Sequence, residues 1–151
     1  MICCMNFLSI QKKKYNVKAG FFTMNHVKLH DVLVNKLGLV DPIIISSINQ
    51  IGFRMNPSQV EVESALKKKD SYNIAMSFLA SGAIRPKEAI DYIGSLDGVD
   101  TVLFGASSPA NAASSSSLFI SSDMSNPLLR RVRSHPLGGN SLCRFLYLLL
   151  L

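Results

Sequence analysis

The sequence predicts an α/β fold of four consecutive strand–helix units, and three observations carry this prediction. Four apolar, β-rich runs occur between residues 15 and 126. Each run is nearly continuous in apolar residues, which is typical of parallel strands buried on both faces. The runs begin roughly 25 to 30 residues apart, the length of one strand-plus-helix unit, and a helical pattern follows each run.

The four predicted strands are, in order, Tyr15–Thr23, Pro42–Ile48, Asn73–Leu79 and Thr101–Ser107. The helix after the first strand is predicted from an apolar stripe at helical spacing, made of Val27, Leu33, Val34 and Leu37. After the second strand, Asn56 is expected to cap a helix that has Pro57 at its first position. Residues 67–70, three lysines and an aspartate, are expected to end that helix in a solvated turn.

The last two helices follow from proline and glycine signals. Pro86 and Glu88 mark the start of the third helix, whose residues Ala89, Ile93 and Leu96 share one face, and Gly98 is expected to stop it. Ser108 and Pro109 repeat the cap-and-proline signal for a fourth helix. The serine run at 114–117 has poor helix propensity, which makes this fourth helix the weakest of the set.

The net charge of +6 divides the chain into three parts. An irregular extension, residues 1–14, and an irregular tail, residues 127–151, carry the excess of lysine and arginine. Residues 15–126 contain nine basic and ten acidic residues. This middle part therefore gives no electrostatic reason to bind a nucleic acid.

Cysteine usage and hydropathy bear on where the protein works. The three cysteines, Cys3, Cys4 and Cys143, lie in the two ends and have no metal-site spacing. A reducing, cytoplasmic setting is therefore expected. The longest apolar stretch, residues 145–151, is far shorter than the ~20 residues of a membrane-spanning helix. The basic and apolar tail at 130–151 suggests a further hypothesis, attachment to a membrane surface.

Four such units fit two architectures: a small doubly wound sheet, or half of a (β/α)8 barrel. Spacing alone does not choose between them, but four segments favour the barrel. They are Ala19–Asn25, Ser47–Gly52, Ala75–Gly82 and Val99–Ser108. In that order they resemble G-V-S-N-F-N, V-N-Q-I-E, A-Y-S-P-L-A/G-S-G and S-V-L-L-G-A-S, sequences typical of strands five to eight of the aldo/keto reductases.

The resemblance implies part of a nicotinamide-dinucleotide site, with NADP as the cofactor. Gln50 matches the glutamine that binds the carboxamide in that family, whereas Met76 replaces the stacking tyrosine. Phe22 and Thr23 stand where a serine and an asparagine would bind the carboxamide. The remaining cofactor residues implied are Gly105, Ala106, Ser107, Ser108 and Asn111, although their loop lacks the lysine and arginine that pair with the 2′-phosphate.

Catalytic residues are not expected in this chain. The catalytic Asp, Tyr, Lys and His of that family belong to the other half of its barrel, so the proton donor for carbonyl reduction has no counterpart here. A half barrel exposes two sheet edges and an apolar interior. We therefore expect self-association, or pairing with a separate N-terminal half.

Simpler interpretations stand beside these. Gln50 can be a strand-end amide that satisfies neighbouring backbone groups. Gly105–Ser108 can be an ordinary strand-to-helix turn, or, in a small α/β binding module, the place where backbone N–H groups hold a phosphorylated ligand. His26 and His30 lie four residues apart on the first predicted helix, but with no third ligand in evidence they are expected to be ordinary surface histidines.

Overall fold

The computed structural model describes residue 14, residue 16 and residues 19–103, which form an α/β fold with one parallel sheet. The strands are β1 (Gly20–Thr23), β2 (Ile43–Ser47), β3 (Tyr72–Met76) and β4 (Thr101–Val102). They lie in the order β1-β2-β3-β4, and each neighbouring pair is parallel. The predicted fold class is thus confirmed at the level of a four-stranded parallel α/β sheet.

Strand register places equivalent residues in rows across the sheet. Phe22 pairs with Ile45, which pairs with Ile74, so these three lie on one face. Ser46 and Ala75 lie on the other face, which the helices cover, since Ala75 belongs to the main buried cluster. Because all strands run the same way, their carboxyl ends gather at a single edge of the sheet.

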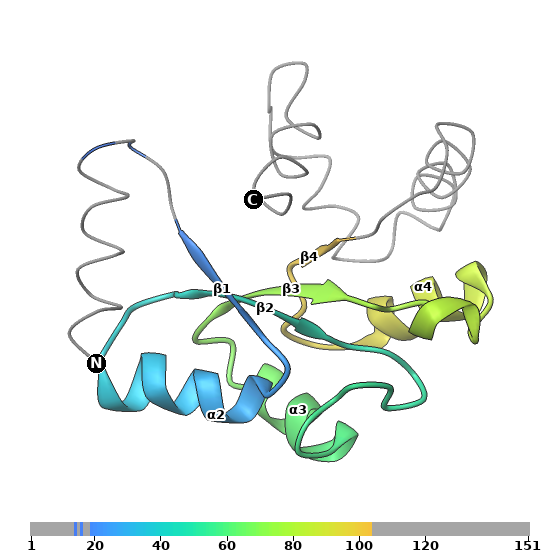
Figure 1. The fold of residues 1–151 in the computed structure, drawn as a ribbon, viewed down its shortest axis with the longest axis horizontal. Helices are drawn as coiled ribbons and strands as arrows, with labels where there is room; N and C mark the ends of the chain where they lie inside the picture. The colour runs from blue at the N-terminus through green and yellow to red at the C-terminus, as the bar shows by residue number, and fades with distance from the viewer. Residues whose placement is uncertain (1–13, 15, 17–18, 104–151) are drawn as a thin grey trace.

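Helices α2 and α3 lie next to each other beneath the sheet, and α4 lies beyond them near the end of β3 (Figure 1). They span His26–His30, Gln59–Leu66 and Pro86–Ser95. After α2 the chain continues without a break as a π-helix, Asp31–Lys36, and a single 3-10 turn, Ala80–Gly82, precedes α4. None of the helices in the described residues is long and apolar enough to cross a membrane.

The helix starts agree only in part with the cap predictions. Pro86 is the first residue of α4, as predicted. The prediction for α3 is wrong, because its cap is Ser58 and not Asn56. The Ser58 side chain accepts a hydrogen bond from the Glu61 N–H and donates one to the Glu61 carboxylate, so a Ser-x-x-Glu capping arrangement fixes the helix start.

The main core lies between the sheet and helices α3 and α4. Its buried members include Ile48 after β2, Val62 and Leu66 from α3, and Ile90 and Ile93 from α4. Lys67, Lys68 and Lys69 are exposed after α3, as predicted. The extension 1–13, the tail 127–151 and the expected strand and helix beyond residue 103 lie outside the described residues.

Candidate functional site

The carboxyl edge of the sheet is the place where the sequence predicts a ligand, and its side chains come from three strand ends. Ser47 pairs with Met76 across β2 and β3, and Thr23 pairs with Ser46 across β1 and β2. Gln50 follows β2 by three residues. In parallel α/β sheets, ligands bind outside this edge.

A braced loop carries Gln50. Asn49, which is fully buried, receives the Phe53 N–H at its side-chain oxygen and donates its amide N–H to the Phe53 carbonyl, each at 2.7 Å. The Gly52 N–H donates to the Asn49 carbonyl, and the Met55 N–H donates to that of Gly52. The Asn49 side chain therefore holds the loop in its folded conformation through two hydrogen bonds to the backbone of Phe53.

Gln50 and Ile51 are the exposed residues at the turn of this loop. Ile51 is 58% exposed, a high value for an isoleucine. Arg54 lies over the Phe53 ring, with its guanidinium carbon 5.1 Å from the ring centre. The loop thus presents an amide, an apolar side chain and a cation together at the carboxyl edge.

Ser47 adds a buried polar group at the end of β2. The residue is 2% exposed, and its Oγ has no hydrogen-bond partner among the described residues. A buried hydroxyl without a partner costs about 1–3 kcal/mol, so such a group calls for an explanation. Ser47 was not among the residues that the sequence singled out, because a serine inside an apolar run gives no signal of its own.

The other residues that the resemblance places in the nicotinamide site differ from Gln50 in their contacts and exposure. The Thr23 hydroxyl donates to the Asn25 carbonyl and accepts from the Asn25 N–H, so the turn after β1 already uses it. Phe22 is 55% exposed and Met76 is half-buried. Gly105, Ala106, Ser107, Ser108 and Asn111 lie outside the described residues.

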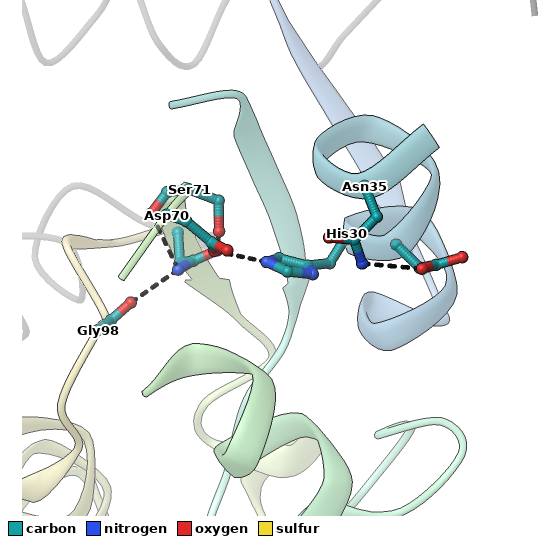
Figure 2. Close-up of polar contacts among 7 residues, drawn as sticks. His30, Asn35, Asp70, Ser71 and Gly98 are labelled. Atoms are coloured by element: carbon teal, nitrogen blue, oxygen red, sulfur yellow. Dashed lines mark hydrogen bonds and ion pairs between the residues drawn. The ribbon is translucent and has the colours of Figure 1, made fainter. Parts of the chain in front are cut away.

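His26 and His30 are buried, and the prediction of surface histidines is wrong. Their side chains are 1% and 2% exposed, and the two rings stack with centres 6.2 Å apart. His26 Nδ1 lies 2.9 Å from Ser46 Oγ on β2. His30 Nε2 lies 2.5 Å from the Asp70 carboxylate, and Figure 2 shows this contact bridging α2 to the turn before β3.

The helical period explains the error. His26, His30 and Leu33 lie at i, i+4 and i+7, and all three are buried, whereas Val27, Val34 and Leu37 of the predicted stripe are only partly covered. The apolar stripe was therefore assigned to a face beside the one that packs on the sheet. Asp70, the partner of His30, lies 40 residues away and gives no spacing signal.

Burial sets the electrostatics of this pair. Burial, with help from the nearby His30, lowers the pKa of His26 to about 4, although Asp70 acts in the opposite direction. Burial alone would raise the pKa of Asp70, but the hydrogen bond from His30 and the neighbouring charges outweigh it and hold that pKa below the usual range. No three His, Cys, Asp or Glu side chains in the described part of the chain are arranged to hold a metal ion.

A cavity of about 400 Å³ lies at the opposite edge, where β3 and β4 begin. It is lined by Asp41, Lys69, Ser71, Tyr72, Gly94, Leu96, Asp97, Gly98, Val99 and Asp100. Lys69 pairs with Asp97 at 3.2 Å, and the Asp100 carboxylate accepts the Asn73 N–H. These carboxylates therefore already serve the turns that begin the strands.

A scan against the models of known protein families finds no match, and neither do searches of the curated proteins and of the solved structures. The resemblance to aldo/keto reductases thus depends on the four sequence segments alone.

Proposed function

We propose that this chain is half of an eight-stranded β/α barrel that keeps part of a dinucleotide-binding edge and has no catalysis of its own. One observation supports the barrel more than any other, the sequential strand order β1-β2-β3-β4. Neighbours in a (β/α)8 barrel follow chain order. A doubly wound sheet reverses its order at a switch point, and the described strands have no such reversal.

The exposed surfaces support an incomplete barrel. Phe22 lies on the sheet face opposite the helices and is 55% exposed. Within the described residues β1 has only β2 as a strand neighbour, so it is an edge strand of the sheet as described. Ile74, on the same face, is only 3% exposed, so the exposed part of this face lies at β1, and covering it is the favourable outcome of association with a second half barrel.

Size-exclusion chromatography with light scattering tests this association. We expect dimers or larger species at micromolar concentration, and a shift toward monomer in Phe22→Asp because that change places a charge on the face to be covered. Val60→Asp is the matched control, since Val60 is 72% exposed on α3, away from that face. A monodisperse wild-type monomer that unfolds cooperatively would refute the half-barrel proposal.

The cofactor edge is proposed from Gln50. Its primary amide, exposed at the carboxyl end of β2, offers one donor group and one acceptor to a carboxamide, which carries the complementary pair. The firm bracing of its loop by Asn49 lowers the entropy cost of presenting that amide. NADP is the cofactor that fits the resemblance.

Titration with NADPH, followed by the fluorescence of the nicotinamide, tests the cofactor edge. Gln50→Ala should weaken binding roughly tenfold, as expected from about 1.4 kcal/mol of lost hydrogen bonding. Asn35→Ala, which removes an exposed amide at the far end of the helical segment, should leave binding unchanged. Absent binding by the wild-type chain would refute the cofactor assignment but would leave the half barrel standing.

A small binding module with a phosphorylated ligand at Gly105–Ser108 is the alternative that the sequence left open. Titration with inorganic phosphate alone, beside that with NADPH, tests this module, and absent binding of both ligands would refute it.

A further inference from the structure

We propose that His26 and His30 form an acid-sensitive latch, in which protonation of the buried His26 releases α2 from β2 and loosens the loop Asn49–Met55. The proposal is independent of the cofactor assignment. It depends on where these side chains lie and on which backbone groups they support.

The latch joins α2 to two other elements. His26 reaches Ser46 on β2, and His30 reaches Asp70 in the turn between α3 and β3. Among the described residues, these two side-chain hydrogen bonds lie on the buried side of α2, whereas others of this segment, such as Asn35 to Asp31, are exposed. Even with the π-helix that continues it, α2 is part of a helical segment shorter than the ~12–15 residues at which isolated helices become stable, so it depends on this packing.

The polar groups around His26 suit the neutral ring. Nδ1 shares a hydrogen bond with Ser46 Oγ, whereas Nε2 is buried with no partner among the described residues. The protonated ring would carry N–H groups on both nitrogens, so Nε2 would become a buried charged donor with nothing to accept its proton. Leaving a charged group in this state costs several kcal/mol, which favours any state that returns His26 to water.

Few charged groups lie near His26 in the described part of the chain. From its own helix there is His30, which stacks on it. From the turn after α3 there is Asp70, whose carboxylate is hydrogen-bonded to His30 and lies beside Lys68. From β2 the Ser46 hydroxyl, which is uncharged, contacts the ring. Within the described residues, the Asp70 carboxylate therefore lies near both imidazole rings, and its direct contact is with His30 and not with His26.

Contacts of Asn25 with Asn56 would transmit the release of α2 to the carboxyl edge of the sheet. The Asn25 side chain caps α2 by accepting the Lys28 N–H, and the Asn25 backbone forms a parallel bridge with Asn56. The Asn56 amide also donates to the Met24 carbonyl at 3.1 Å. The end of the Asn49–Met55 loop is thus attached to the cap of α2, and loss of the cap removes that attachment.

The direction of the pH dependence follows from linkage. The pKa of His26 is about 4 when α2 is docked and about 6.5 in water. The open state therefore binds the proton more tightly, so docking weakens as the pH falls below about 6.5 and the effect levels off below about 4. Between pH 7 and pH 5 the ratio of docked to open α2 should fall about twentyfold.

Backbone amide hydrogen exchange at pH 7 and pH 5, expressed as protection factors, tests this. We expect roughly twentyfold loss of protection at Leu29 and His30 in α2, with a smaller loss at Phe53 and Met55. His26→Asn keeps an amide that can bond Ser46 but cannot be protonated, so its protection should change less than threefold. Asp31→Asn, which changes an exposed carboxylate at the start of the adjoining π-helix, is the control and should behave as wild type.

The latch is overturned if wild-type protection at α2 is the same at both pH values, or if His26→Asn loses as much as wild type. NMR titration of the wild-type histidine rings gives a second measurement that needs no variant. A His26 ring that titrates near its ordinary value of about 6.5 in the folded chain contradicts the latch, whereas a ring that stays neutral until α2 opens supports it.

Discussion

Gly98 and Gly82 form a natural pair for testing how closely the turn before β4 packs on α3. Both have left-handed backbones, with φ of +90° at Gly98 and +91° at Gly82. A Cβ at Gly82 would meet nothing within 4 Å, whereas a Cβ at Gly98 would lie 2.0 Å from the backbone oxygen of Leu66. Alanine at the two positions therefore shares one cost and differs in the other.

The shared cost is the strained backbone, about 1–2 kcal/mol for a residue with a Cβ. Gly98→Ala adds a collision with backbone, which no side-chain rotation can relieve. The Leu66 carbonyl accepts the Lys69 N–H, and the Gly98 carbonyl accepts the Asn73 amide, so moving either chain disturbs a further hydrogen bond. We expect this second cost to be about 2–3 kcal/mol, which gives roughly 3–5 kcal/mol in total at Gly98.

Urea unfolding followed by far-ultraviolet circular dichroism measures the difference, and the chain has no tryptophan to complicate a spectroscopic comparison. With a slope of ~1–2 kcal/mol per molar urea, the Gly98→Ala midpoint should fall roughly 1–3 M below that of Gly82→Ala. Equal midpoints for the two variants would show that the turn at Gly98 does not pack closely against Leu66 and would refute this reasoning.

Two further substitutions test the polar supports of the fold. Asn49→Ala should lower the free energy of unfolding by about 2–4 kcal/mol, because it leaves the N–H and the carbonyl of Phe53 without their partner. Limited proteolysis should then cut within the Asn49–Met55 loop, and a loop that stays uncut would contradict the role given to Asn49. Tyr92→Phe should lower the free energy of unfolding, measured with urea at pH 7, by about 1 kcal/mol. The Tyr92 hydroxyl donates a hydrogen bond to the Glu63 carboxylate and, together with Gln59, holds the pKa of that carboxyl below its usual range. Stability from a lowered carboxyl pKa is lost on acidification, so the cost should shrink at pH 3, and a cost that is equal at both pH values would argue against this link.

The strands show what an apolar run can and cannot predict. β2 was predicted at 42–48 and lies at Ile43–Ser47, because its isoleucines pack on both faces of the sheet. The third run was predicted to continue to residue 79, but β3 ends at Met76. Ser77 has a left-handed φ of 52° and its carbonyl accepts the Ala80 N–H, so the chain turns while it is still apolar. The apolar residues beyond that point, such as Phe78, are core residues of a turn.

The sequence pointed to a candidate site residue only where its neighbours along the chain gave the signal. Gln50 was singled out because it follows a strand in a recognisable order of residues, and its exposure agrees with either interpretation, so its role stays a prediction. Ser47 and the histidine latch were missed because their meaning depends on partners from other elements. A Ser-x-x-Glu pattern at Ser58 was available in the sequence, but the neighbouring Asn-Pro pair gave a competing cap.

Buried asparagine side chains hold the backbone of turns at both edges of the sheet. Asn49, after β2, binds both backbone groups of Phe53, and Asn73, at the start of β3, donates to the carbonyls of Ser71 and Gly98. Each amide satisfies the polar groups of a turn that would otherwise be exposed to the apolar core. Because a side-chain amide has both a donor and an acceptor at fixed separation, it can fix a turn more firmly than an apolar residue of the same size. The turns that flank the sheet should therefore be rigid where an asparagine holds them, whereas α2, which an ionisable ring holds in place, should be sensitive to acid.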